Sequence, residues 1–179
     1  MRKLVTTTHL EMRDRASLRP PRAGLEPPGF SVVRAEVACP ELNRFFYLAV
    51  GGDWLWYERV GWTRERWLGW LSRPEVETWI GYQRGTPAGY FELERQGDSV
   101  EIAYFGLLPS FVGSGLGGAL LHKAASRGFD LGAARVWVHT CDLDHPSALA
   151  NYRARGFQVF DTVEAFEEVP EKASPFVPG

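Results

Sequence analysis

Apolar residues in the middle of the chain are spaced as in β-strands. Alternating or continuous apolar runs of strand length are separated by the short turn sequences RGTP and QGD. The three runs occupy residues 76–83, 88–95 and 100–108. Three successive strands joined by tight turns predict an antiparallel meander.

Two helices are predicted before the meander, after a strand at residues 30–37. Pro40 opens the apolar stretch ELNRFFYLAVGG, and the two glycines at its end terminate it. Thr63 is suited to cap the second helix, which Pro74 closes. The expected helices therefore both lie between the first strand and the meander.

After the meander, helix and strand patterns alternate. A glycine-rich loop leads into a helix that extends to about Gly128, and a strand at 134–140, a helix at 146–155 and a strand at 156–160 follow. This order predicts a mixed α/β sheet with at least one right-handed crossover. The chain is expected to divide into an N-terminal strand and linker, one domain and an acidic surface tail, at residues 1–29, 30–163 and 164–179.

Composition limits the class of protein. The 179 residues, of which 45% are hydrophobic, fit one globular domain with a sizeable core. The formal net charge of −2 gives no reason to expect a nucleic-acid partner. No apolar run of about 18 residues and no signal-peptide pattern is found, so we expect a cytoplasmic protein without a membrane span. Cys39 and Cys141 form no disulfide framework.

Four glycines gather where a helix is predicted to begin, at Gly113, Gly115, Gly117 and Gly118. Glycine in a helix interior costs about 1 kcal/mol relative to alanine. The first turn of a helix, however, carries backbone N–H groups without intrahelical partners at the positive end of the helix dipole. The cluster therefore predicts a phosphate cradle, against the alternative of a turn that only permits close packing.

The spacing GxGxxG at Gly113, Gly115 and Gly118 is also that of a dinucleotide-binding turn. Three features argue against that alternative. The glycines follow a meander, four residues separate them from the strand, and only about 60 residues remain for a doubly wound sheet. A Walker-type GKS or GKT sequence is absent as well.

Two longer stretches carry a family resemblance, VEIAYFGLLPSFVGSGLGGALLHKA and ARVWVHTCDLDHPSALANYRARGFQVF. Together they resemble the GNAT superfamily of acyl-CoA-dependent N-acyltransferases over residues 76–160. The family loop (Arg/Gln)-x-x-Gly-x-(Gly/Ala) corresponds to Val112-x-x-Gly115-x-Gly117, with valine in place of the usual arginine or glutamine. The second family signature is met by Ala148, Tyr152, Gly156 and Phe157.

The resemblance implies a GNAT-like mixed, mostly antiparallel central sheet with helices on both faces, and acetyl-CoA as co-substrate. The thioester carbonyl would be held by the backbone N–H of Leu107 or Leu108, at the end of a strand that splays from its neighbour. The pantetheine and phosphates would lie along the strand edge and loop, on Val112, Gly113, Ser114, Gly115, Leu116, Gly117, Gly118 and Asn151. No metal site is implied.

The resemblance also implies two proton transfers. A carboxylate, directly or through water, would take a proton from the amine, and the strand residues Glu101 and Glu92 are the candidates. Alternation puts Glu92 and Glu94 on one face, and Glu101 on one face with Ala103, Phe105 and Leu107. Tyr152 would protonate or hydrogen-bond the departing thiolate. No acyl-enzyme is needed, so Cys141 has no required role.

The acceptor is expected to be a primary amine of a small molecule or of a peptide. Six of the seven tryptophans fall between residues 54 and 79, where aromatic walls could hold a cation, with Asp53 and Glu58 adding negative charge. The competing interpretation is that these rings pack in the core. His145 either serves the site or caps the following helix. A non-catalytic CoA-binding sensor of the same fold, and a homodimer, are left open.

Overall fold

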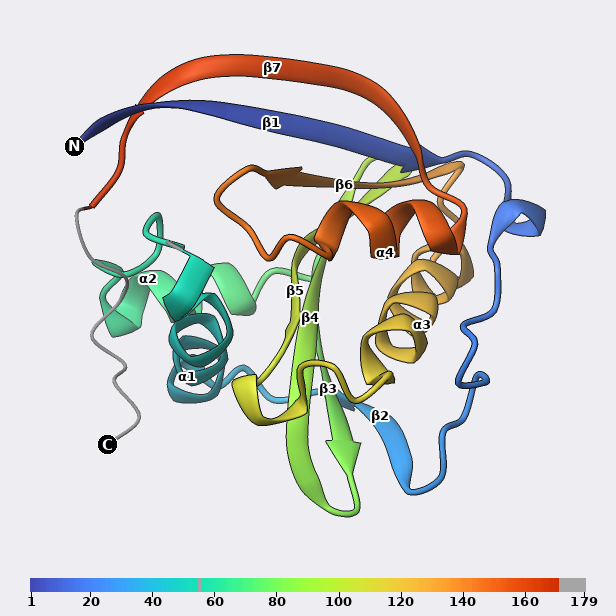
Figure 1. Ribbon diagram of the computed structural model, residues 1–179. Helices are drawn as coiled ribbons and strands as arrows, with labels where there is room; N and C mark the ends of the chain where they lie inside the picture. The colour runs from blue at the N-terminus through green and yellow to red at the C-terminus, as the bar shows by residue number, and fades with distance from the viewer. Residues whose placement is uncertain (55, 171–179) are drawn as a thin grey trace.

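The computed structural model describes residues 1–54 and 56–170. Seven strands form a single sheet in the order β2-β3-β4-β5-β6-β1-β7 (Figure 1). The strands are β1 (Arg2–Met12), β2 (Phe30–Ala35), β3 (Val76–Gln83), β4 (Thr86–Gln96), β5 (Ser99–Leu107), β6 (Arg135–Cys141) and β7 (Gln158–Glu168). The helices are α1 (Pro40–Gly51), α2 (Arg64–Leu71), α3 (Leu116–Asp130) and α4 (Ala148–Arg155).

The sheet is antiparallel except where β5 runs parallel to β6, across the connection made by α3. The predicted mixed, mostly antiparallel sheet and its meander β3-β4-β5 are therefore confirmed. Thr63 caps α2 as predicted, because its side chain accepts a hydrogen bond of 3.2 Å from the N–H of Arg66.

Helices cover both faces of the sheet, as Figure 1 shows. Tyr90 and Phe91 are neighbours on β4, and successive strand residues point to opposite faces. Tyr90 packs against Phe46 of α1, whereas Phe91 belongs to the cluster that contains Leu120 of α3. The helix pair α1 and α2 thus lies on the face opposite α3 and α4.

Both segments expected to flank the domain contribute strands to its sheet. β1 lies between β6 and β7, and β7 continues past residue 163 to Glu168. The expected boundary at 163 therefore falls inside a strand. Almost every residue of β7 is exposed, so this strand has no apolar alternation that the sequence could reveal. The remainder of the expected tail, residues 171–179, lies outside the described residues.

Candidate active site

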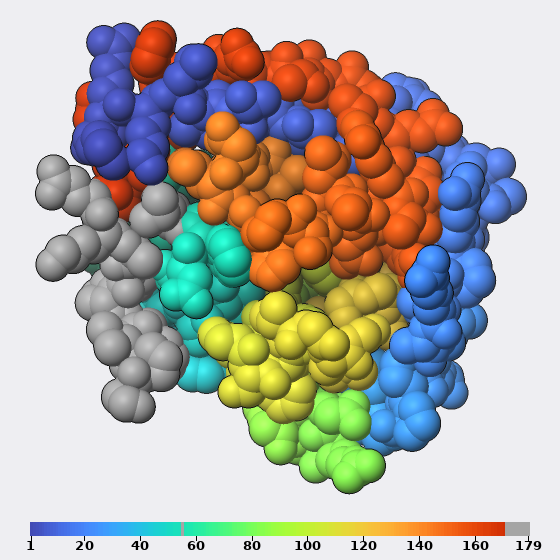
Figure 2. Space-filling view, in the orientation of Figure 1, coloured from blue at the N-terminus to red at the C-terminus, as the bar shows by residue number. Residues whose placement is uncertain are grey.

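A cavity opens where β5 and β6 separate. The two strands pair only as far as Glu101 with Trp137, although β5 continues to Leu107 and β6 to Cys141. The cavity has a volume of about 500 Å³ and is lined by the separated ends of both strands. Figure 2 shows the loop before α3 in yellow, the β6–α4 segment in orange and the α1–α2 segment in turquoise meeting around it.

The free edge of β5 presents backbone groups to this cavity. The N–H of Leu108 donates to the carbonyl of Ala88 on β4, at 2.8 Å, and is therefore not available. In an antiparallel ladder the residues alternate between facing the partner strand and facing away from it. Leu107 and Phe105 consequently turn their N–H groups toward the gap. Of the two residues expected to hold the thioester carbonyl, only Leu107 therefore has an N–H that faces the cavity. Phe105 replaces Leu108 as the second candidate.

A β-bulge in β5 changes the expected grouping of side chains. Glu92 pairs with Tyr104 and Leu93 pairs with Ile102, so Ala103 has no partner on β4. The bulge reverses the alternation beyond it. Glu101 therefore shares a face with Tyr104, and the expectation that Glu101 lies on one face with Phe105 and Leu107 is wrong. The prediction that Glu92 and Glu94 share a face is confirmed by their pairing with Thr78 and Val76.

The glycine loop joins the end of β5 to α3. Gly113 and Gly115 have φ angles of +81° and +83°, which favour glycine, and Gly115 is the N-cap of α3 without a side-chain cap. A side chain at Gly113 would meet nothing within 4 Å. The space above the loop is therefore open to a ligand, and the first N–H groups of α3, at Leu116, Gly117 and Gly118, have no intrahelical acceptor.

Three loop positions differ from what the glycine pattern suggests. The N–H groups of Val112 and Ser114 already donate to Pro109 and Phe111, each at 3.2 Å, so neither is free for phosphate. Gly118 is needed for packing, because a Cβ there would lie 2.9 Å from Cβ of Pro21. The cradle is thus shorter than residues 112–118 and begins at Gly113.

The residues of the second signature lie on α4, across the cavity from β5. Asn151 and Tyr152 both line the cavity, and Asn151 Nδ2 lies 3.7 Å from the position of a Cβ on Gly117. Gly156 has a φ of +106°, and a Cβ on it would collide with the backbone carbonyl of Ser17. This glycine is required by the close approach of two chain segments and not by a ligand.

Tyr152 is 6% exposed and packs between the rings of Phe105 and Phe157, with centroid distances of 6.2 Å to each. Burial raises the pKa of its hydroxyl, so the group stays protonated at neutral pH. None of the described residues forms a hydrogen bond with this hydroxyl. Tyr152 can therefore donate a hydrogen bond to a ligand in the cavity.

Two further side chains of the cavity wall are explained by local structure. His145 accepts a hydrogen bond at Nδ1 from the N–H of Ser147, at 3.0 Å, which supports the capping interpretation. Burial, together with the nearby carboxylate of Asp144, raises the pKa of the Cys141 thiol to about 11. Cys141 is therefore a protonated thiol at neutral pH and a poor nucleophile.

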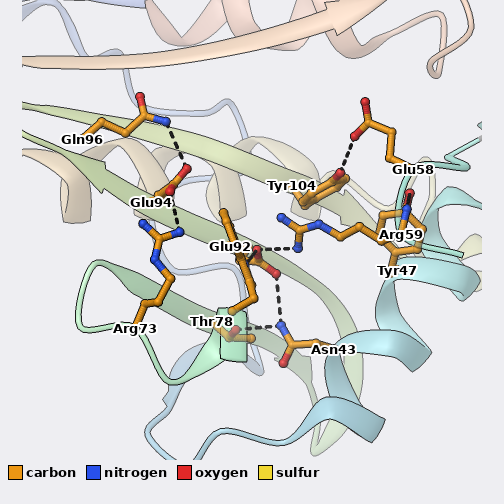
Figure 3. A network of polar contacts seen from close by, with 11 residues as sticks. Asn43, Tyr47, Glu58, Arg59, Arg73, Thr78, Glu92, Glu94, Gln96 and Tyr104 are labelled. Atoms are coloured by element: carbon orange, nitrogen blue, oxygen red, sulfur yellow. Dashed lines mark hydrogen bonds and ion pairs between the residues drawn. The ribbon is translucent and has the colours of Figure 1, made fainter. Parts of the chain in front are cut away.

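Glu92 lies outside the cavity, in a buried network on the α1–α2 face of the sheet (Figure 3). The residue is 1% exposed, and its carboxylate accepts from Arg59 at 2.7 Å, from Trp70 at 2.6 Å and from Asn43 at 3.2 Å. All of these donors come from α1, α2 and the segment between them. Since Glu92 is occupied and enclosed, the structure gives it no access to a substrate amine.

Glu101 lies outside the cavity lining as well. One of its oxygens lies 3.2 Å from Nδ1 of His139, and the other accepts from Gln96 at 2.8 Å. The carboxylate of Glu101 raises the pKa of His139, which does line the cavity. Glu101 therefore reaches the site only through His139.

Two carboxylates that do line the cavity, Glu58 and Glu167, were not among the candidate bases. Glu58 accepts a hydrogen bond of 2.9 Å from the hydroxyl of Tyr104, and Glu167 accepts one of 2.5 Å from the hydroxyl of Tyr57. Burial raises the pKa of both tyrosines, which therefore donate as neutral hydroxyls. The sequence signal for Glu58 was its place among the tryptophans, whereas nothing in the exposed strand β7 marked Glu167.

The tryptophan-rich segment serves two purposes. Trp54 and Trp56 line the cavity, and Trp56 donates to Asp144 at 3.0 Å, which ties the α1–α2 segment to the β6–α4 loop. Trp62 and Trp70 instead enclose the guanidinium of Arg59, each with a ring centroid 4.5 Å from its Cζ. Most of the aromatic wall expected for a substrate cation therefore surrounds a cation of the protein itself.

Residues 1–54 and 56–170 contain neither a cluster of metal-ligating side chains nor a membrane-spanning helix. No group of three or more His, Cys, Asp or Glu side chains there is placed to hold a metal ion. Within the same residues, no helix is both long and apolar enough to cross a membrane.

Comparison with solved structures supports the fold. A GCN5-related N-acetyltransferase from Kribbella flavida superposes with a TM-score of 0.66 over 97% of this chain and 60% of its own, at 18% sequence identity. The ribosomal-protein-S18-alanine N-acetyltransferase of Escherichia coli gives a TM-score of 0.57 over 72% of this chain and 77% of its own, at 16% identity. At such identities the likeness shows the fold alone.

Sequence comparison gives the family. An uncharacterized N-acetyltransferase of Mycobacterium tuberculosis is 32% identical over 98 residues, which are 54% of this chain and 62% of that protein. The sequence model of the Acetyltransferase (GNAT) family matches residues 38–157, more than half of the chain. The glycine loop, the separated strands and α4 all fall within that span, and the chain belongs to the Acetyltransferase (GNAT) family.

Proposed function

We propose that this protein transfers an acetyl group from acetyl-CoA to a primary amine by direct attack of the amine on the thioester. One observation carries the proposal. A single cavity joins the free edge of β5 and the N-terminus of α3 to the carboxylates Glu58 and Glu167. A site for an acyl-CoA and a site for a cationic amine thus share one continuous space.

The donor end of the cavity fits an acyl-CoA. When bound, acetyl-CoA supplies an activated thioester. The N–H groups at the start of α3 and around Gly113 and Gly115 would hold its pyrophosphate, since a helix N-terminus favours anions. The free edge of β5 would pair with the amide groups of the pantetheine arm. The N–H of Phe105 or Leu107 would stabilise the negative charge that develops on the carbonyl oxygen.

The acceptor end favours a positively charged amine. Among the described residues that line the cavity there are three carboxylates, Glu58, Glu167 and Asp144, and no lysine or arginine. The hydrogen bonds that Glu58 and Glu167 accept come from neutral tyrosine hydroxyls, and neither carboxylate forms an ion pair with a described residue. An ammonium group is attracted to such a surface, whereas an acceptor that carries a carboxylate is repelled.

Glu58 is our assignment for the base, in place of Glu92 and Glu101. It removes a proton from the ammonium form of the acceptor and passes it to solvent, so that the neutral amine attacks. The C–S bond of the thioester breaks as the C–N bond forms, and the sulfur leaves as a thiolate. Tyr152 donates a hydrogen bond to that sulfur, which takes its proton from solvent, because a tyrosine of raised pKa is a weaker acid than a thiol.

Three further features belong to the proposal. The reaction takes place in the cytoplasm, the acceptor is a small-molecule amine, and the protein can form a homodimer. The competing function is a CoA-binding sensor that lacks turnover. This alternative is supported by Val112, which stands where the family motif has Arg or Gln.

Release of free CoA, followed with a thiol reagent, tests the proposal. The panel holds aliphatic diamines, monoamines of equal length and the corresponding ω-amino acids. We expect turnover in the order diamine, monoamine, amino acid, and a fall in kcat/KM of at least about 100-fold for Glu58→Gln. Glu75→Gln, which changes a partly exposed carboxylate that does not line the cavity, serves as the control. Tight binding of acetyl-CoA with no CoA release from any amine would favour the sensor.

A further inference from the structure

Among the described residues, none forms an ion pair with a buried arginine that lies next to the glycine loop. Arg155, the last residue of α4, is 8% exposed. Its Nε and Nη1 atoms are shielded from solvent and make no hydrogen bond. Burial lowers the pKa of this guanidinium, and no carboxylate of the described residues pairs with it. An uncompensated buried charge is costly, which raises the question of what compensates it.

Arg155 lies directly behind the first turn of α3. Its Nη1 atom is 3.1 Å from the position that a Cβ would take on Gly118, and Gly118 is among the residues that line the cavity. α3 has 15 residues and begins at Gly115 without a side-chain cap. The positive end of the helix dipole and a buried guanidinium are therefore side by side. The two positive groups repel each other, and an anion bound between α3 and the cavity would offset this repulsion.

A neighbouring histidine reports the positive potential around Arg155, because part of the shift of its pKa comes from Arg155 itself. His122 lies one turn farther along α3, and burial, Arg155 and Arg15 together lower its pKa. Arg15 itself is paired with Asp130 at 2.6 Å, at the other end of α3. Within residues 1–54 and 56–170, Arg155 thus lies close to the first turn of α3 and forms no ion pair with a carboxylate.

The loop in front of α3 lacks the arginine or glutamine of the family motif, and with it the positive charge that an arginine would supply. Val112 occupies that position, 46% exposed and on the cavity wall. We infer that Arg155 provides the missing positive charge from behind the helix and thereby stabilises a diphosphate bound at the N-terminus of α3. Through low-dielectric protein a charge acts at this range without direct contact. The inference rests on the proposed function, which identifies the diphosphate as that of acetyl-CoA.

Calorimetric titration of Arg155→Met tests the inference. Methionine keeps the apolar stem and removes the charge. We expect affinity for CoA and for dephospho-CoA to fall about 10-fold or more, and affinity for pantetheine, which has no phosphate, to stay unchanged. Arg153→Met removes an exposed charge from the same helix and should leave all three affinities at the wild-type value.

Two further measurements separate charge from structure. Without ligand, Arg155→Met should melt at or above the wild-type temperature, because it removes an unpaired buried charge; a structural arginine would give a lower melting temperature. Adding Val112→Arg to Arg155→Met should recover most of the lost CoA affinity, and the recovery should shrink as salt rises.

The inference is overturned if Arg155→Met binds CoA within about twofold of wild type, or if it loses affinity for pantetheine equally. Inorganic pyrophosphate distinguishes a failure here from a failure of the proposed function. If the wild type binds pyrophosphate but no CoA, and the binding depends on Arg155, the anion site is confirmed and the acetyltransferase proposal is rejected. Absence of both kinds of binding in the wild type would reject both.

Discussion

The two ends of the cavity are built in different ways. The donor end consists of backbone: the free N–H groups of β5 and the first turn of α3, with glycines that leave them open. The acceptor end consists of side chains that come from separate parts of the chain, with Glu58 before α2, Tyr104 on β5 and Glu167 on β7. A backbone site is encoded locally and is recognisable in the sequence, whereas a side-chain site exists only after the chain has folded.

The largest effect is expected at the donor end. Gly115→Asp should abolish binding of acetyl-CoA, because it puts bulk and negative charge where the cradle begins, at a φ of +83°. Gly132→Asp is a matched control at the opposite end of α3, with the same φ of +83° and open space around it. Calorimetry should show no heat for the first variant and wild-type affinity for the second. Equal affinities of the two variants for acetyl-CoA would show that residues 113–118 do not form the phosphate cradle.

The support beneath the acceptor end comes next in size. Glu92→Gln leaves Arg59 buried without a countercharge and should cost about 3–5 kcal/mol of unfolding free energy. Glu94→Gln, two residues away on the same face, breaks a partly exposed pair with Arg73 and should cost about 0–1 kcal/mol. Denaturant titration measures both. A similar loss of unfolding free energy in the two variants would contradict the idea that the buried pair of Glu92 and Arg59 stabilises the protein more than the partly exposed pair of Glu94 and Arg73.

Tyr152 lines the cavity and packs against Phe105 of β5. Tyr152→Phe removes one oxygen and keeps the ring packing, so affinity for acetyl-CoA should stay at the wild-type value, while loss of the hydrogen bond to the departing sulfur lowers kcat by about 10-fold to 1,000-fold. Because burial raises the pKa of this tyrosine, the rate of the wild type should show no loss from its deprotonation up to about pH 10. An unchanged kcat with chemistry as the slow step, or an alkaline limb that Tyr152→Phe removes, would contradict the assignment.

The smallest effect is expected at Cys141. Its thiol, with a pKa of about 11, is not the nucleophile of a direct transfer, so Cys141→Ala should keep kcat within about twofold. Cys39→Ala removes the other thiol, at the N-cap of α1, and controls for loss of a cysteine as such. A burst of CoA release in the wild type that Cys141→Ala abolishes would instead indicate an acyl-enzyme.

The strand and helices that form the donor end were predicted well, because their signals are local. The structure contains all three predicted features: the glycines at a helix start, the strand before them, and a helix with Tyr152 four residues before Gly156. The errors arose where one local irregularity mattered. The bulge at Ala103 reversed the alternation that had grouped Glu101 with Phe105, and a ladder bond to Ala88 removed the N–H of Leu108.

The acceptor end was predicted poorly for a different reason. Strand periodicity placed Glu92 and Glu94 on one face, but it could not show that Arg59 would close over Glu92 with Trp62 and Trp70 around it. Only the pairing of β7 with β1 brings Glu167 to Tyr57, 110 positions earlier in the chain. Such contacts depend on long-range packing, which composition and spacing do not record.

The sequence by itself determined the elements, the mixed sheet and the glycine-rich helix start, because turn residues, periodicity and glycines act over a few neighbouring positions. The tertiary structure alone decided which carboxylates face the cavity, which cation the tryptophans enclose and where Arg155 lies relative to α3. Each of those outcomes is a competition between burial and charge compensation among side chains distant in sequence, and that competition is resolved only when the helices pack on the sheet.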